Sequence, residues 1–285
     1  MAGAGRRKSN NWALVAPLYL FTILFVGLPL IYMVYLSFMS RAKVWGFTND
    51  FTLQNYLQIL EPIYMSTFGT SLKLAVLTTA IVTLIGYPFG YFMARLGAKA
   101  KRLMMIGIMI PFWTSSLVRL NGWIIVFRSN GVLDKLLMWI GLTDEPLKLL
   151  YSYPAVVFGM VYALCPFMML SVYSSAEKLD WRLLEAASDL GAGRARAFFD
   201  IAFPLTMPGL MSGIVLTFIP SMGLFFVADI LGGSKVVLIG NVIQEQMTKG
   251  RNLPFAAALS VVLMLMTSCM LGLYRKICGN WKGLD

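Results

Sequence analysis

Long apolar segments separated by short polar ones dominate this chain. Six of these segments are long enough to cross a bilayer, at about residues 12–38, 69–93, 103–127, 153–173, 208–228 and 254–274. A helix that spans the hydrocarbon core needs about 20 mostly apolar residues, a length that a globular core does not require. The pattern therefore predicts an all-α membrane protein with six transmembrane helices, in which residues 1–285 form a single transmembrane domain.

Proline falls inside five of the six segments: Pro29, Pro88, Pro111, Pro166 and Pro220. Proline lacks a backbone donor and kinks a helix, and such backbone is tolerated at depth only where protein or a cavity covers it. We expect five interrupted spans around a moving or solvent-lined interior, although proline is also simply commoner in membrane helices. The two halves of the chain show no convincing repeat, so the pattern gives no support to an inverted-repeat secondary transporter.

Composition agrees with the membrane interpretation and excludes several kinds of chemistry. Hydrophobic residues make up 58% and charged residues 13% of the chain, and there is no histidine. Without histidine there is no Ser-His-Asp triad and no HExxH zinc site. Cys165, Cys269 and Cys278 show no CxxC spacing and fit reduced structural thiols. We expect no metal and no cofactor.

The basic residues are distributed unevenly between the polar segments. Fourteen of the 24 Lys and Arg lie in segments 1–11, 94–102, 174–207 and 275–285, against eight in the alternate segments. The positive-inside rule places both termini in the cytoplasm and makes the net charge of +11 a topology signal rather than a nucleic-acid footprint. The first apolar run is too long for a signal peptide, so it should stay attached. Lys73 and Arg119 lie inside spans; we expect Lys73 to snorkel outward and Arg119 to face a carboxylate or a carbonyl.

The cytoplasmic segment 174–207 reads as two short helices. Asp180 can cap a helix that runs through Leu190, and Gly191 suits the position after its end. A second helix is expected over 194–203, after which two prolines lead the chain back into the bilayer. Apolar residues recur in this segment at near-helical spacing, which favours docking of a helix into a groove on another protein. Packing against the chain's own membrane bundle is the alternative.

The same segment carries a motif. Glu185-Ala186-Ala187 is followed after three residues by Gly191, and after nine more by Ile201-Ala-Phe-Pro204. This string resembles the EAA loop of binding-protein-dependent ABC importer permeases, with Phe203 where leucine is usual. The resemblance implies the type I importer permease fold and a loop that docks on a cytoplasmic ATPase dimer. Glu185, Ala186, Ala187, Gly191, Ile201 and Pro204 would be its coupling residues. The chain has no GxxxxGK[ST] sequence, so we expect ATP hydrolysis on a separate subunit and no enzyme activity here.

Further segments resemble the spermidine/putrescine branch of this family. They lie at 51–56, 110–119, 173–180, 201–209 and 222–233, and so extend over nearly the whole chain. The resemblance implies a multi-pass protein of the bacterial inner membrane. Its partners would be a second, similar permease, an ATPase dimer and a periplasmic polyamine-binding protein, with membrane lipid around it and no nucleic acid.

A polyamine is a flexible polycation, suited to aromatic faces and carboxylates. Trp113 follows the Pro111 break, Asp229 lies at the outer end of span five, and Tyr56 precedes span two. We expect these three residues on the substrate path. The competing interpretation makes Trp113 and Tyr56 interface anchors and gives Asp229 a local partner.

Other functions remain open at this point. The same machine could carry sulfate, molybdate, iron or sugar, because such importers share the EAA loop. A gradient-driven transporter or channel would need intramembrane acids, and the six spans hold none apart from Asp229 at an end. An intramembrane enzyme is disfavoured by the lack of histidine and of a GxSxG elbow.

Overall fold

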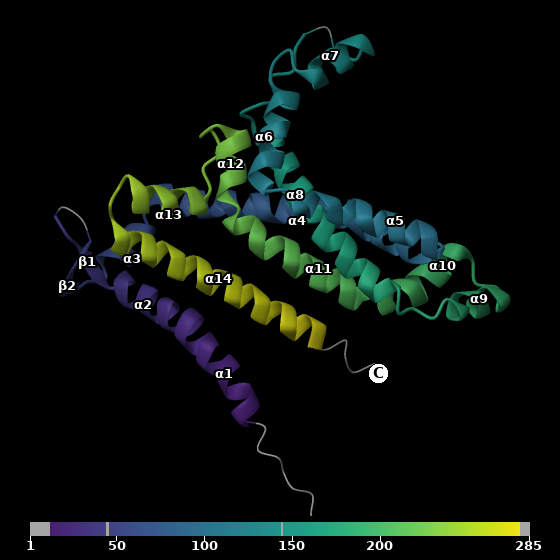
Figure 1. The fold of residues 1–285 in the computed structure, drawn as a ribbon, viewed down its shortest axis with the longest axis horizontal. Helices are drawn as coiled ribbons and strands as arrows, with labels where there is room; N and C mark the ends of the chain where they lie inside the picture. The colour runs from purple at the N-terminus through teal and green to yellow at the C-terminus, as the bar shows by residue number, and fades with distance from the viewer. Residues whose placement is uncertain (1–11, 44–45, 144, 280–285) are drawn as a thin grey trace, which may run out of the picture. The chain divides into compact units, whose positions relative to one another are not determined.

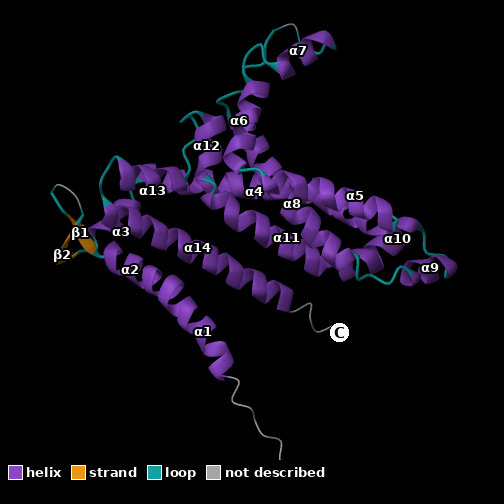
Figure 2. Ribbon diagram, in the orientation of Figure 1, coloured by secondary structure: helices purple, strands orange, loops and turns teal. Residues whose placement is uncertain are grey.

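The computed structural model describes residues 12–43, 46–143 and 145–279. Helices account for most of them, and the two short strands β1 (Met39–Arg41) and β2 (Phe47–Phe51) pair in one antiparallel hairpin (Figure 2). Arg6, Arg7, Lys8 and Lys282, which contribute to the predicted orientation, lie outside the described residues. The chain divides into two compact units, Met1–Leu60 with Ile243–Met264 and Glu61–Val242 with Leu265–Asp285.

The first unit contains the first span and the hairpin that follows it. The span is formed by α1 (Trp12–Thr22), a π-helical turn η1 (Ile23–Gly27) and α2 (Leu28–Ser37). After the hairpin comes the short helix α3 (Gln54–Ile59), whose buried Asn55 donates hydrogen bonds to the carbonyls of Ser37 and Met39 at 3.0 and 2.9 Å. These bonds satisfy backbone groups at the end of the span, so the polar segment is fixed against the helix it leaves.

The second unit holds most of the helices. Their bounds are α4 (Pro62–Arg95), α5 (Ala98–Met109), the 3-10 turn η2 (Ile110–Trp113), α6 (Ser116–Phe127), α7 (Val132–Trp139), α8 (Tyr153–Ala176), α9 (Arg182–Asp189), α10 (Arg194–Ala197), the π-helical turn η3 (Phe198–Ala202), α11 (Phe203–Gly223) and α12 (Phe225–Gly232) (Figure 1). Two further helices, α13 (Ile239–Thr248) and α14 (Leu253–Gly279), each begin in one unit and end in the other.

Five of the described helices are long and apolar enough to cross a membrane, and the bent pair formed by 98–113 and α6 makes a sixth span if it crosses as one. The bend in this pair is 95° and lies at Thr114 and Ser115, directly after the turn that contains Pro111. The six-span, all-α prediction is therefore confirmed.

The prediction that proline interrupts five spans is wrong in detail. Pro88 lies inside the continuous helix α4, and Pro166 lies inside the continuous helix α8. Pro220 is also helical, and the fifth span ends three residues later, at Gly223. Pro29 follows the π-helical turn η1, in which the Leu28 N–H bonds to the carbonyl of Ile23, and the helix continues through it. Proline always removes one backbone N–H donor, but whether the helix then bends depends on how the helix is packed.

The core of the second unit is a bundle of α4, α8 and α11 (Figure 1). Small residues let these helices approach closely: a Cβ added at Gly86 or Gly90 would lie 2.7 Å from the Met168 Cγ or 2.6 Å from the Met169 carbonyl. Two hydrogen bonds also cross between helices, Tyr87 to Thr206 at 2.8 Å and Ser171 to the Gly209 carbonyl at 2.8 Å. Such bonds contribute only about 0.6 kcal/mol each inside a membrane, so close packing through small residues is the main source of stability.

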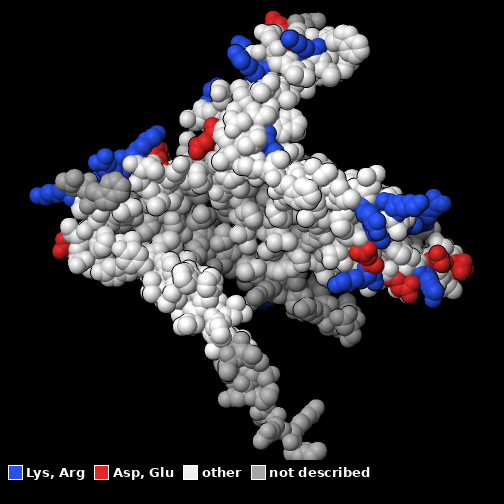
Figure 3. Space-filling view, in the orientation of Figure 1, with Lys and Arg blue, Asp and Glu red and all other residues white. Residues whose placement is uncertain are grey.

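Charged side chains of the second unit gather at its ends. Lys and Arg lie over α5 and around α9 and α10, and again around α7, with little charge on the helical surface between them (Figure 3). This arrangement fits helices whose apolar middle sections face lipid while their ends reach water.

Candidate functional site

The candidate site is α9 and the residues that join it to the span after it. Helix α9 ends in a Schellman arrangement: the Gly191 N–H donates to the carbonyl of Ser188, and the Ala192 N–H donates to that of Ala187, both at 2.9 Å. Gly191 has φ +85°, a left-handed conformation that glycine adopts without a steric penalty. The sequence places Gly191 correctly at the end of this helix. At the other end the predicted cap is wrong by one residue: Trp181 occupies the N-cap position, and Asp180 Oδ1, one residue earlier, accepts from the Arg182 N–H at 3.1 Å.

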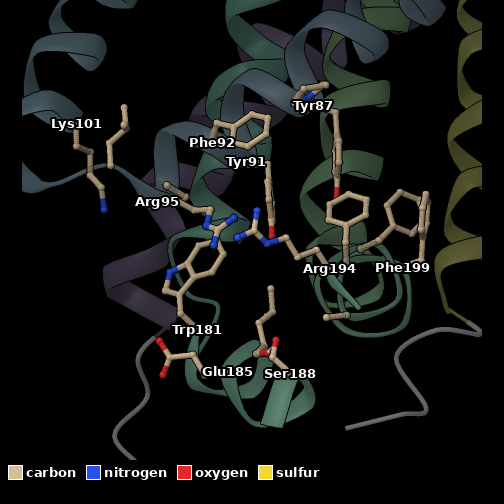
Figure 4. Close-up of a pocket in the computed structure, with 17 residues that line it drawn as sticks. Tyr87, Tyr91, Phe92, Arg95, Lys101, Trp181, Glu185, Ser188, Arg194 and Phe199 are labelled. Carbon is tan, nitrogen blue, oxygen red and sulfur yellow. Dashed lines mark hydrogen bonds between the residues drawn. The ribbon is translucent and has the colours of Figure 1, made fainter. Parts of the chain in front are cut away.

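One face of α9 packs on the chain's own bundle. Trp181 and Leu184 contact the core formed by α4, α8 and α11. The Trp181 ring meets the Tyr91 ring edge to face with centroids 5.6 Å apart, and the Arg95 guanidinium lies 5.2 Å from the Trp181 ring centroid (Figure 4). The sequence marks Arg95 only as a topology charge, and nothing in its spacing points to this stacking. Helix α9 is thus attached to the end of span two through aromatic and cation–π contacts.

The opposite face of α9 is open. Glu185 and Ala186 are exposed, as are Leu183 (46%) and Leu190 (89%), whereas Ala187 is half-buried. Exposed leucines beside an alanine form an apolar surface that another protein can cover. Packing on the bundle thus accounts for the inner face of the helix, and docking on a partner stays a prediction for the open face.

The second short helix expected over 194–203 is not separate from span five. The chain is helical from Arg194 to Gly223 without a break, through α10, the π-helical turn η3 and α11. In η3 the Phe203 N–H bonds to the carbonyl of Phe198, five residues back, and Pro204, which has no N–H, follows immediately. The wide turn thus accommodates the missing donor and keeps the helix continuous.

This continuity separates the motif residues into two groups. Glu185 and Ala186 are exposed side chains of α9, while Ile201 and Pro204 are half-buried in the continuous helix that follows. The structure therefore places the first group on an accessible surface and the second group in the helix that continues into span five.

A charged cluster links α5 to the end of α8 beside this site. Lys101 Nζ lies 3.1 Å from Glu177 Oε1, and the Tyr173 hydroxyl donates to the same oxygen at 2.6 Å. The hydrogen bond from Tyr173, followed by that from Lys101, lowers the pKa of Glu177 because both stabilise the carboxylate.

Trp113, one of the three predicted substrate-path residues, is highly exposed. It is the last residue of η2, next to the 95° bend, and 87% of it is exposed. The structure records no ring contact for it among the described residues. Its indole face is therefore free to contact another molecule, and this agrees equally with an interface anchor.

Asp229 has a local partner. Its Oδ1 accepts a hydrogen bond from Asn241 Nδ2 at 2.6 Å, and the same amide contacts the Phe225 carbonyl at 3.2 Å. The carboxylate is nevertheless exposed and has no cation within ion-pair distance among the described residues. Its charge is thus oriented by Asn241 but not neutralised.

Tyr56 belongs to the first unit and is committed to contacts there. Its hydroxyl is hydrogen-bonded to Ser37 Oγ at 2.7 Å, and its ring lies 5.2 Å from that of Phe38. Trp113 and Asp229 belong to the second unit.

The expectation for Arg119 needs correction. Its guanidinium lies 5.8 and 5.6 Å from the ring centroids of Phe112 and Tyr162, and Nη2 donates to Ser116 Oγ at 3.1 Å. No carboxylate or carbonyl among the described residues accepts from it, because aromatic faces hold this cation instead.

No group of three or more His, Cys, Asp or Glu residues that could hold a metal ion occurs in the part of the chain that the structure describes.

Comparison with known proteins identifies the family. A family model described as the binding-protein-dependent transport system inner membrane component matches residues 86–277. The spermidine/putrescine transport system permease protein PotB of Escherichia coli (strain K12) is 42% identical over 252 residues, which cover 88% of this chain and 92% of that protein. PotB of Haemophilus influenzae is 39% identical over 262 residues, covering 92% of each.

The fold has solved counterparts. A bacterial alginate ABC transporter in complex with an alginate-bound periplasmic protein contains a chain that superposes with a TM-score of 0.70 at 15% identity, over 93% of this chain and 92% of that one. At this identity the likeness concerns the fold, which is that of ABC importer permeases. The chain is a multi-pass inner-membrane protein that belongs to the family of binding-protein-dependent transport system inner membrane components.

Proposed function

We propose that this chain is the permease subunit of an ATP-driven importer of polyamines, spermidine or putrescine. The observation that carries the proposal is the 42% identity with a spermidine/putrescine permease along 88% of the chain, which includes the substrate-side segments as well as the loop. Importers for sulfate, molybdate, iron or sugar would be expected to share mainly the loop.

The coupling step is assigned to α9. Its open face, with Glu185 and Ala186 between Leu183 and Leu190, would seat on a cytoplasmic ATPase dimer. Its inner face is attached through Trp181 to Tyr91 and Arg95 at the end of α4. A displacement of the docked face would therefore move α4, and the continuous helix from Arg194 would carry it into span five. Rigid elements with packed contacts are the physical means by which such displacements travel.

The cargo path is assigned to the membrane face shared with a second, similar permease. Trp113 supplies an exposed indole face, and Asp229 supplies an oriented, uncompensated carboxylate. An ammonium over an indole gains about 1–2 kcal/mol when desolvated, which is about a tenfold change per contact. Tyr56 would contribute less, since its hydroxyl is already bonded to Ser37.

The experiment is to purify the assembled complex and identify its subunits and cargo. A second permease, an ATPase and a periplasmic binding protein should co-purify. Denaturation of the binding protein should release spermidine or putrescine, which mass spectrometry then identifies. Release of sulfate, molybdate, iron or a sugar would reject the polyamine proposal while leaving the importer intact. Absence of an ATPase would reject the coupling role of α9.

A further inference from the structure

A cleft opens in the second unit between α9, the end of α4 and the start of α10. Its volume is about 1160 Å³, and Tyr91, Arg95, Trp181, Arg194 and Phe199 are among its lining residues (Figure 4). The cleft lies on the inner side of α9, away from the open face that carries Leu183 and Leu190. Glu185 is the one lining residue that also belongs to the surface assigned to the ATPase.

Positive charge in this cleft is not neutralised. Arg95 and Arg194 both line it, and neither has a carboxylate within 4 Å among the described residues. Lys101 also lines the cleft but is paired with Glu177, and Glu185 is the one acidic residue of the lining. Two converging guanidinium groups without counter-ions attract an anion, and their planar donors suit phosphate oxygens.

The geometry holds one of these cations in place. Arg95 stacks on Trp181 at 5.2 Å, and Trp181 in turn packs against Tyr91. The guanidinium ends of Arg95 and Arg194 face each other beside the Tyr91 ring in Figure 4. A cation that is already oriented loses little side-chain freedom when a ligand binds.

The position of the cleft indicates an amphiphilic anion. Arg95 is the last residue of α4, and Arg194 is the first residue of the helix that continues into span five, so both cations lie at span ends. Phe92 and Phe199 also line the cleft and are 61% and 63% exposed. Exposed aromatic side chains beside paired arginines fit a ligand with a charged head and apolar chains, whereas an acidic protein loop or free phosphate would leave these rings uncovered.

We infer that this cleft binds the phosphate-bearing headgroup of an anionic phospholipid of the cytoplasmic leaflet, with Arg95 and Arg194 on the phosphate and Phe92 and Phe199 under the acyl chains. Basic pockets between membrane helices on the cytoplasmic side are suited to such headgroups. The bound lipid joins α9, α4 and α10 at one point.

The test measures lipid retention by native mass spectrometry of the assembled importer, released from micelles with equal amounts of phosphatidylglycerol and phosphatidylcholine. The wild type should retain phosphatidylglycerol preferentially. The double variant Arg95→Gln with Arg194→Gln should lower that preference about tenfold, to the level of phosphatidylcholine. The double variant Arg95→Lys with Arg194→Lys should keep much of the preference, because lysine also binds phosphate.

Arg196→Gln is the matched control. Arg196 is two residues from Arg194, its side chain is 80% exposed and paired with Asp200, and it does not line the cleft, so retention should not change. If the double glutamine variant does not assemble, the single variant Arg95→Gln is measured against the same control.

Three results would overturn the inference. The first is equal phosphatidylglycerol preference in the wild type and the glutamine variants. The second is displacement of the lipid by millimolar inorganic phosphate, which would make the cleft a site for a soluble anion. The third is loss of the ATPase from the glutamine variant with lipid retention intact, which would make acidic residues of that subunit the occupant.

Discussion

Gly191 fixes the end of α9 through its backbone alone. Its φ is +85°, yet a Cβ at this position would meet nothing within 4 Å. Gly191→Val should therefore strain the backbone by about 1–3 kcal/mol without a clash. We expect polyamine uptake by reconstituted importer to fall several-fold while ATP hydrolysis continues.

Two substitutions control this prediction. Gly193→Val makes the same change two residues away, where φ is −65° and the space is also open, and should leave uptake unchanged. Gly191→Asn should retain most of the uptake, because asparagine tolerates the left-handed conformation. Uptake at the wild-type level in both valine variants would show that the end of α9 has no part in coupling.

Asp229 allows its charge to be tested separately from its hydrogen bond. Asp229→Asn keeps an oxygen that can accept from Asn241, which lies at 2.6 Å, but removes the negative charge. If the charge attracts a polycation, labelled spermidine uptake should fall several-fold in this variant and recover in Asp229→Glu, with equal amounts of assembled complex. Unchanged uptake in Asp229→Asn would leave the carboxylate a purely local role.

At the scale of elements, the link between α5 and α8 depends on the charge of Glu177. Bonds from Tyr173 and Lys101 lower its pKa in the folded protein, so their contribution to stability is present above the ordinary pKa of about 4.3 and is lost as pH falls through the folded value. Glu177→Gln should therefore lower the thermal midpoint slightly at pH 7, and the difference from the wild type should vanish in acid. A difference that persists at the lowest pH would mean that Glu177 acts through packing instead.

Hydropathy predicts the spans because a crossing helix meets its requirements locally. Each helix must hydrogen-bond its own backbone groups and present apolar side chains to lipid. The end of α9 at Gly191 is predictable for the same reason, since one residue type suits that conformation. The effect of proline is not local. Pro111 lies at a 95° break, whereas Pro88 lies in a continuous helix, and the two are alike in sequence terms.

The division of α9 into two faces also lies beyond the sequence. Trp181 and Leu184 pack inward while Leu183 and Leu190 are exposed, although all four are apolar and helically spaced. Which of them pack inward depends on Tyr91 and Arg95, which are distant in the chain. The joining of α10 to span five is hidden as well, because Pro204 suggests a break that the π-helical turn removes.

For the whole molecule, the orientation in the membrane remains a prediction. With the native cysteines replaced, including the exposed Cys269, we expect Lys135→Cys to react with an impermeant thiol reagent on intact spheroplasts and Lys99→Cys to remain unlabelled. Both lysines are exposed, and Lys99 is a better site than Lys101, which is paired with Glu177. Labelling of Lys99→Cys without lysis would reverse the assigned topology.

ATP-driven movement of a polyamine through this permease is the central proposal. The most direct measurement is uptake of radiolabelled spermidine and putrescine by proteoliposomes that contain the complete importer and its binding protein. Uptake is compared with and without ATP on the side of the membrane that carries the ATPase. We predict that uptake requires ATP and that its rate saturates with polyamine concentration. Unlabelled polyamine should compete with the labelled polyamine, whereas sulfate, molybdate, ferric iron and sugar should not. Uptake that proceeds without ATP, or that follows one of those other substrates, would contradict it.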